Sequence, residues 1–158
     1  MDKIVFITGA SSGIGAGCAR KFASQGASLI LNARNVNKLS ALKEELEKQY
    51  GAKIYLLPFD VRDRKAATSA LESLPKEWQS IDILVNNAGL VIGTDKEQEG
   101  SLDEWDIVID TNIKALLAMT RLIVPGMVER KRGHIINIGS IAGDAAYPGG
   151  SEIGRAHV

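Results

Sequence analysis

The sequence has a single cysteine, no excess of charge of either sign and no long hydrophobic run. Cys18 cannot form a disulfide within the chain, and the apolar stretch after the first three residues is too short for a signal-peptide core, so we expect a cytoplasmic protein. Because 19 basic residues balance 19 acidic ones, the positive surplus that favours binding to nucleic acid is missing. No apolar run approaches the roughly 20 residues that span a bilayer, so no membrane partner is expected.

What the sequence does have is a regular alternation of short apolar runs with amphipathic stretches. Its 158 residues, 45% of them hydrophobic, are enough for one globular core and too few for two. The pattern predicts strands at 4–7, 28–32, 53–57, 81–85 and 134–138. It predicts helices at 16–25, 37–51, 64–74 and from 101 toward 130, the last kinked or divided at Pro125-Gly126. Strands that alternate with helices form a parallel sheet covered on both faces, so the predicted fold class is α/β, doubly wound.

A glycine-rich segment, Ile7-Thr8-Gly9-Ala10-Ser11-Ser12-Gly13-Ile14-Gly15, follows the first predicted strand. Its glycines permit a tight turn, and the N-terminus of the following helix offers unpaired N–H groups and a partial positive charge to a pyrophosphate. The placement of this glycine-rich segment directly after the first buried strand favours a dinucleotide site, whereas the glycine spacing alone is a weak signal. A plain strand-to-helix turn is the alternative.

Further motifs occur at fixed places along the chain. Asp60 follows the third strand, Asn86-Asn87-Ala88-Gly89 the fourth, Asn112 lies in the long helix, and Asn137-Ile138-Gly139-Ser140 ends the fifth strand. Together with the glycine-rich segment, residues 1–151 resemble the first part of the Rossmann domain of the short-chain dehydrogenase/reductase family. Within it they are most similar to the bacterial NADP-dependent 3-hydroxy acid (serine-type) dehydrogenases. The resemblance implies an incomplete Rossmann sheet that contains strands one to five only.

The expected cofactor contacts come from the carboxyl ends of four strands. Asp60 can accept a hydrogen bond from the adenine amino group, with the Val61 backbone alongside, or it caps its own loop. The second strand ends without an acidic residue for a ribose 2′-hydroxyl, whereas Arg34 suits a 2′-phosphate, so we predict NADP rather than NAD; a solvated surface arginine is the alternative. The full predicted set is Gly9, Ser11, Ser12, Gly13, Ile14, Gly15, Arg34, Asp60, Val61, Asn87, Ala88 and Gly89.

The resemblance also implies a catalytic set of Ser, Tyr, Lys and Asn. Ser140 and Asn112 occupy the Ser and Asn positions, Ser140 to orient the substrate oxygen and Asn112 to hold a water in a proton relay; a plain turn serine is the alternative for Ser140. The family spacing puts Tyr at 153 and Lys at 157, where this chain has Ile153 and His157. Neither side chain can do the work of the residue that it replaces. No Cys/His spacing predicts a metal site.

The last residues, Ile153 to Val158, correspond to one reading frame of a widely used sequencing adapter followed by a stop. We therefore expect residues 152–158 to be a non-native tail, the alternatives being a genuinely truncated gene and a non-catalytic homologue. For this chain expressed alone, we expect the fifth strand to be an open edge that favours aggregation. The family uses the Asn112 helix and a later helix as its subunit interface, so the parent protein is expected to be a homotetramer.

The sequence is compatible with two functions. The first is an NADP-dependent oxidoreductase that moves a hydride between NADP(H) and a small carbonyl compound or secondary alcohol, with a 3-hydroxy acid as the substrate that the subfamily implies. On this reading the chain as given is inactive, because the Tyr and Lys are missing. The second is a non-catalytic dinucleotide-binding module. A Rossmann-like methyltransferase is disfavoured, since Arg34 stands where an acidic residue is needed.

Overall fold

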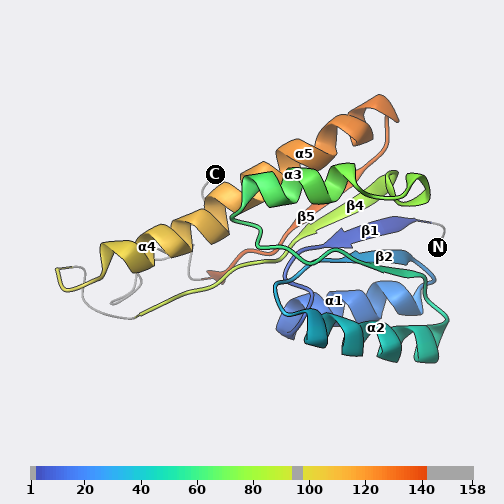
Figure 1. Ribbon diagram of the computed structural model, residues 1–158, viewed down its shortest axis with the longest axis horizontal. Helices are drawn as coiled ribbons and strands as arrows, with labels where there is room; N and C mark the ends of the chain where they lie inside the picture. The colour runs from blue at the N-terminus through green and yellow to red at the C-terminus, as the bar shows by residue number, and fades with distance from the viewer. Residues whose placement is uncertain (1–2, 94–97, 142–158) are drawn as a thin grey trace.

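A five-stranded sheet lies between two layers of helices in the computed structural model, which describes residues 3–93 and 98–141 (Figure 1). The first half contains β1 (Ile4–Ile7), α1 (Gly13–Ser24), β2 (Ser28–Leu31), α2 (Val36–Tyr50), β3 (Ile54–Leu56) and α3 (Arg64–Glu72). The second half contains a 3-10 turn η1 (Lys76–Trp78), β4 (Ile81–Asn86), α4 (Leu102–Ile109), a π-helical turn η2 (Asp110–Lys114), α5 (Ala115–Glu129) and β5 (His134–Asn137). All five predicted strands and all four predicted helical stretches are present.

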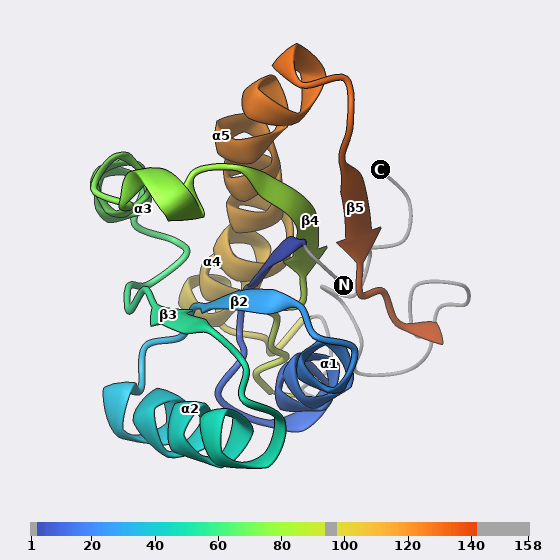
Figure 2. The same ribbon diagram turned by 90° about the vertical axis from the view of Figure 1, so that its right-hand side faces the viewer.

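The sheet has the order β3-β2-β1-β4-β5, and every neighbouring pair is parallel. β1 lies in the middle, with Val5 opposite Leu29 on β2 and Ile83 on β4. All carboxyl ends therefore reach the same edge, where open α/β sheets bind ligands. β5 pairs only with β4 among the described strands, and Figure 2 shows it at the side of the sheet away from β3. The predicted doubly wound α/β fold is confirmed.

The two faces of the sheet carry different cores. Strand residues alternate between them, so Val5 and Ile7 pack on the face covered by α1 and α2, while Phe6 packs on the face covered by α3 and α5. The first face is built largely from small side chains: Ala10, Ala16, Ala19, Ala23, Ala27 and Ala33 are all buried. The second uses larger ones, among them Met119, Ile123 and Met127 of α5. The small residues let α1 approach the sheet closely.

The long helical stretch differs from the prediction in the place of its irregularity. α5 continues through Pro125, so the proline does not divide the helix as expected. A proline removes one N–H and crowds the preceding turn, but α5 is held on both sides of it by the buried Ile123 and Met127. The break in regular α-helical hydrogen bonding comes earlier, at η2, which contains Asn112. Such π-turns are often found at functional sites.

The beginning of α1 also differs from the prediction, because the helix includes Gly13 and Gly15. Glycine is a poor helix former, which is why the sequence favoured a later start. Residues 152–158 and the positions 153 and 157 lie outside the described residues. Across the part of the chain that is described, no helix combines the length and the apolar character needed to cross a membrane.

Candidate functional site

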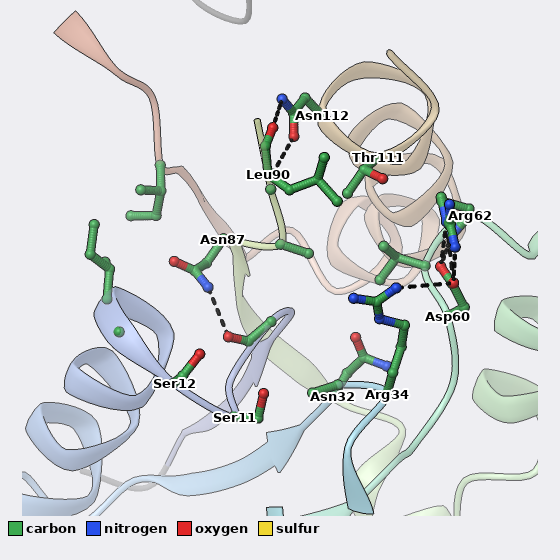
Figure 3. A pocket seen from close by; sticks show the side chains of 18 of the residues that line it. Ser11, Ser12, Asn32, Arg34, Asp60, Arg62, Asn87, Leu90, Thr111 and Asn112 are labelled. Atoms are coloured by element: carbon green, nitrogen blue, oxygen red, sulfur yellow. Dashed lines mark hydrogen bonds and ion pairs between the residues drawn. The ribbon is translucent and has the colours of Figure 1, made fainter. Parts of the chain in front are cut away.

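A cavity of about 990 Å³ opens at the carboxyl ends of β1, β2 and β4 (Figure 3). Thirteen of the fourteen predicted site residues line it: Gly9, Ser11, Ser12, Gly13, Ile14, Arg34, Asp60, Val61, Asn87, Ala88, Gly89, Asn112 and Ser140. Gly15 is the exception, since it is buried behind the loop. The structure thus brings to one place residues that are more than a hundred positions apart in the sequence.

The glycine-rich loop forms one wall of this cavity. Gly9 has a φ of +64°, and a Cβ there would lie 2.8 Å from Ala88 Cα, so only glycine allows the loop to approach the end of β4. A Cβ on Gly15 would collide with the Gly9 carbonyl, which explains a glycine at this buried position. Gly13, at a φ of +52°, has no such neighbour within 4 Å and borders open space.

The first turn of α1 is open to the cavity. Its N-cap residue, Ser12, makes no side-chain capping bond, so the N–H groups of this turn are not satisfied by the cap. An N–H cluster with a positive helix end, next to open space at Gly13, fits the pyrophosphate of a dinucleotide. Ile14 lines the same cavity and is exposed.

Thr8 ties this loop to the segment after β4. Its hydroxyl accepts hydrogen bonds from the Asn87 and Ala88 backbone N–H groups, both at 3.0 Å, and donates to the Val85 carbonyl at 3.3 Å. In return, Asn87 Nδ2 donates to the carbonyls of Thr8 and Gly9, at 2.9 and 3.1 Å. These reciprocal bonds hold two walls of the cavity in a fixed relation.

The far end of the cavity is charged. Arg34 follows β2, while Asp60 and Arg62 follow β3, and Figure 3 shows the three side chains together. The Arg62 guanidinium donates to both Asp60 oxygens and the Arg62 backbone N–H donates to Oδ1, while Arg34 Nη1 lies 4.0 Å from Oδ2. The Arg62 hydrogen bonds hold the pKa of the Asp60 carboxyl below its usual value, against the opposing effect of partial burial. The same pairing raises the pKa of Arg62.

The loop-capping alternative for Asp60 is present in the structure, while its contact with adenine stays a prediction. The carboxylate caps its own loop by accepting the Arg62 N–H at 3.0 Å, and it also lines the cavity where a ligand can reach it. Arg34 is mostly exposed, yet it too lines the cavity beside Asn35 and Lys38. This arrangement gives the far end a net positive charge, which suits an anionic group.

The expected catalytic side chains, Asn112 and Ser140, line the cavity from η2 and from the segment after β5. Asn112 lies in η2, where its Oδ1 accepts from the Leu90 N–H at 2.9 Å and its Nδ2 donates to the Leu90 carbonyl at 2.7 Å (Figure 3). The Asn112 side chain thus fixes the segment that follows β4. Ser140, three residues after β5, lines the cavity and is exposed. The water-holding role of Asn112 stays a prediction, as does the role of Ser140 toward a substrate.

The β5 end of the site is fixed by a polar cluster. Asn86 Nδ2 donates to Asn137 Oδ1 at 2.9 Å and to Thr120 Oγ1 at 3.0 Å, which joins β4, β5 and α5. Ile138 continues the pairing by donating its N–H to the Asn86 carbonyl. The chain just before Ser140 is therefore held against β4.

Comparison with known proteins agrees with this geometry. The model of the family described as short chain dehydrogenase matches residues 3–152. The chain belongs to the short-chain dehydrogenase family. Its sequence is 48% identical over 151 residues to the NADP-dependent 3-hydroxy acid dehydrogenase YdfG of Escherichia coli, covering 96% of this chain and 59% of that protein. It is 43% identical over 150 residues to the NADP-dependent 3-hydroxy acid dehydrogenase of Schizosaccharomyces pombe, covering 94% of this chain and 58% of that protein.

Solved structures of short-chain dehydrogenases show the same backbone. The serine dehydrogenase of Escherichia coli superposes with a TM-score of 0.89 at 48% identity, over 96% of this chain and 68% of that one. The closed form of serine dehydrogenase complexed with NADP+ gives a TM-score of 0.88 at 47% identity, over 96% and 59%. The chain thus spans about three fifths of the length of the curated relatives that it matches.

Several residues that shape this short-chain dehydrogenase site were not predicted. Thr8 and Arg62 carry the hydrogen bonds described above, and the buried Asn32 donates to the Leu57 and Phe59 carbonyls, which links β2 to the segment after β3. Thr8 stood in the recognised loop and Arg62 stood two positions after Asp60, so position was an available signal. For Asn32 the signal was a polar residue at the end of an apolar run.

Proposed function

We propose that this chain is the cofactor-binding part of an NADP-dependent oxidoreductase that acts on a small carbonyl compound or secondary alcohol, with 3-hydroxy acids as the substrate class. The observation that carries the proposal is the cavity, in which the glycine-rich loop, the arginine after β2 and the segment after β4 converge. The names of the relatives support both the cofactor and the substrate class.

The residues present fit NADP(H), which when bound supplies or accepts the hydride. The N–H groups at the start of α1 would hold the pyrophosphate, and Gly9 and Gly13 leave room for it. Arg34 would bind the 2′-phosphate, because its forked donors match phosphate oxygens. Asp60 would accept from the adenine amino group. Asn87, Ala88 and Gly89 form the wall alongside.

The reacting end is only partly supplied by this chain. Ser140 would hydrogen-bond the substrate oxygen, and Asn112 would take part in the proton relay. The proton donor of the family is a Tyr assisted by a Lys, and we propose that residues 152–158 are a non-native tail that replaces the segment carrying them. Residues 1–151 are then the N-terminal part of a Rossmann domain that, when complete, forms a homotetramer in the cytoplasm. A non-catalytic dinucleotide-binding module is the second candidate, favoured by Ile153 and His157 as they stand.

The test begins with the gene. Amplification from the source DNA with a primer inside the codons for 86–89 recovers its 3′ end, and we expect Tyr at codon 153 and Lys at codon 157. The complete protein encoded there is then assayed for NADP reduction with 3-hydroxy acids, with NAD as the matched control cofactor. A stop codon after Val158 in independent reads, together with dinucleotide binding by the product, would establish the non-catalytic module instead.

A further inference from the structure

Asp60 lies close to two arginines, and its contacts with them differ in strength. Arg62 meets it closely, since its Nη2 lies 2.7 Å from Oδ2, its Nε 3.1 Å from Oδ1, and its backbone N–H also donates to Oδ1. Arg34 comes from a different strand and approaches no nearer than 4.0 Å. That distance is an ion pair without a hydrogen bond. The forked contact with Arg62 is therefore the dominant one.

This difference matters because Arg34 is the residue expected to meet a phosphate. A carboxylate with no other partner would attract the Arg34 guanidinium and would also repel a phosphate bound beside it. Forked pairing with Arg62 offsets the Asp60 charge locally and fixes the direction of its oxygens. Arg34, whose side chain is 67% exposed, then keeps its donors available toward the cavity.

We propose that Arg62 determines the preference for a dinucleotide with a 2′-phosphate, by holding and neutralising Asp60 so that Arg34 is left to bind the phosphate. The inference rests on the proposed NADP function and deepens it. Arg62 is a positioning residue here, since it acts through Asp60. Its side chain is about one-third exposed and also lines the cavity, so direct contact with the phosphate is the competing explanation.

A double-mutant cycle separates the two explanations. In the complete protein, calorimetry gives the dissociation constants of adenosine 2′,5′-bisphosphate and of 5′-AMP, which differ only in the 2′-phosphate. The variants are Arg62→Gln, Asp60→Asn and the two together. Arg64→Gln is the matched control, because Arg64 is a nearby arginine outside this cavity whose removal changes the net charge equally. Melting temperatures show that each variant folds.

We expect Arg62→Gln to weaken the bisphosphate about tenfold and 5′-AMP less than about threefold, while Arg64→Gln changes their ratio by less than about twofold. In the Asp60→Asn background, where the carboxylate charge is gone, the added Arg62→Gln should leave the ratio within about twofold. Equal loss in both backgrounds would mean direct contact with the phosphate and would overturn the inference, as would an unchanged ratio in the single variant. A wild-type protein that binds both ligands equally overturns the proposed NADP preference itself.

Discussion

Replacement of Thr8 by valine tests how much the bonds between the loop and the β4 end contribute to stability. Valine has nearly the same shape, so the packing of this 2% exposed side chain is kept while its hydroxyl is lost. Two backbone N–H groups, those of Asn87 and Ala88, then lose the oxygen that they share at 3.0 Å. Thr8→Ser is the matched control, because serine keeps the hydroxyl and loses only a methyl group.

The expected magnitudes differ enough to measure. Each donor left without a partner at this partly buried place costs about 1 kcal/mol or more, so Thr8→Val should lower the free energy of unfolding by about 2 to 3 kcal/mol. Thr8→Ser should lower it by about 1 kcal/mol, the value of one buried methyl group. The loss expected for Thr8→Val is a large share of the roughly 5 to 15 kcal/mol that is the free energy of unfolding of an ordinary domain.

Urea unfolding of the complete protein, followed by circular dichroism, gives the comparison. With a typical decrease in the free energy of unfolding per molar urea, the unfolding midpoint of Thr8→Val should lie roughly 0.5 to 1 M below that of Thr8→Ser. Dinucleotide binding should weaken in the same order, because the same bonds hold two walls of the cavity. Equal midpoints for the two variants would show that water satisfies the two N–H groups and that the reasoning is wrong.

Three further results are expected. Gly9→Ala should destabilise the protein by about 1 to 3 kcal/mol and abolish dinucleotide binding, because Gly9 has a positive φ and touches the end of β4. Gly17→Ala is the control, since Gly17 borders open space on α1, and it should stabilise the protein by about 0.5 to 1 kcal/mol. Equal melting temperatures for the two variants would contradict this expectation. Asp82 accepts a hydrogen bond from the Ile4 N–H and forms an ion pair with the exposed Arg132. Asp82→Ala should therefore lower the free energy of unfolding by about 1 to 2 kcal/mol, and Asp82→Asn by less than about 1 kcal/mol. Urea midpoints in the opposite order would refute this role of Asp82. Because folding lowers the pKa of Asp60, the ionised Asp60 carboxylate contributes to stability at a pH above the ordinary carboxyl pKa. This contribution is lost as the pH falls below about 4. The melting temperature of the wild type should therefore drop more on acidification than that of Asp60→Asn.

The strands were accessible from the sequence because each is a short apolar run between amphipathic stretches, and the runs of β1, β2 and β4 are largely buried. Val5, Phe6 and Ile7, for example, are all fully buried. A helix start was equally accessible: helical sequence was predicted from residue 101, and Ser101 is the N-cap of α4, where its hydroxyl accepts the Glu104 N–H at 3.4 Å. Such features depend on neighbours in the chain, which is why pattern alone identifies them.

Other features depend on segments that meet only in the fold. The π-turn η2 and the bonds from Asn112 to Leu90 join residues 22 positions apart, and no periodicity in either segment indicates them. Continuation of α5 past Pro125 likewise follows from its packing on the sheet, which outweighs the local preference of proline. For the site, the sequence identified which residues gather, but not the bonds through Thr8 and Arg62 that orient them.

The all-parallel sheet has a consequence for how the chain is made. β1, the middle strand, leaves the ribosome first, but its second neighbour β4 begins only at Ile81. At about 5 to 20 residues per second, synthesis of the intervening part of the chain takes about 4 to 15 s. During that time the edge of β1 that pairs with β4 is without its partner. A chaperone that covers nascent chains would have its longest period of useful contact at this edge.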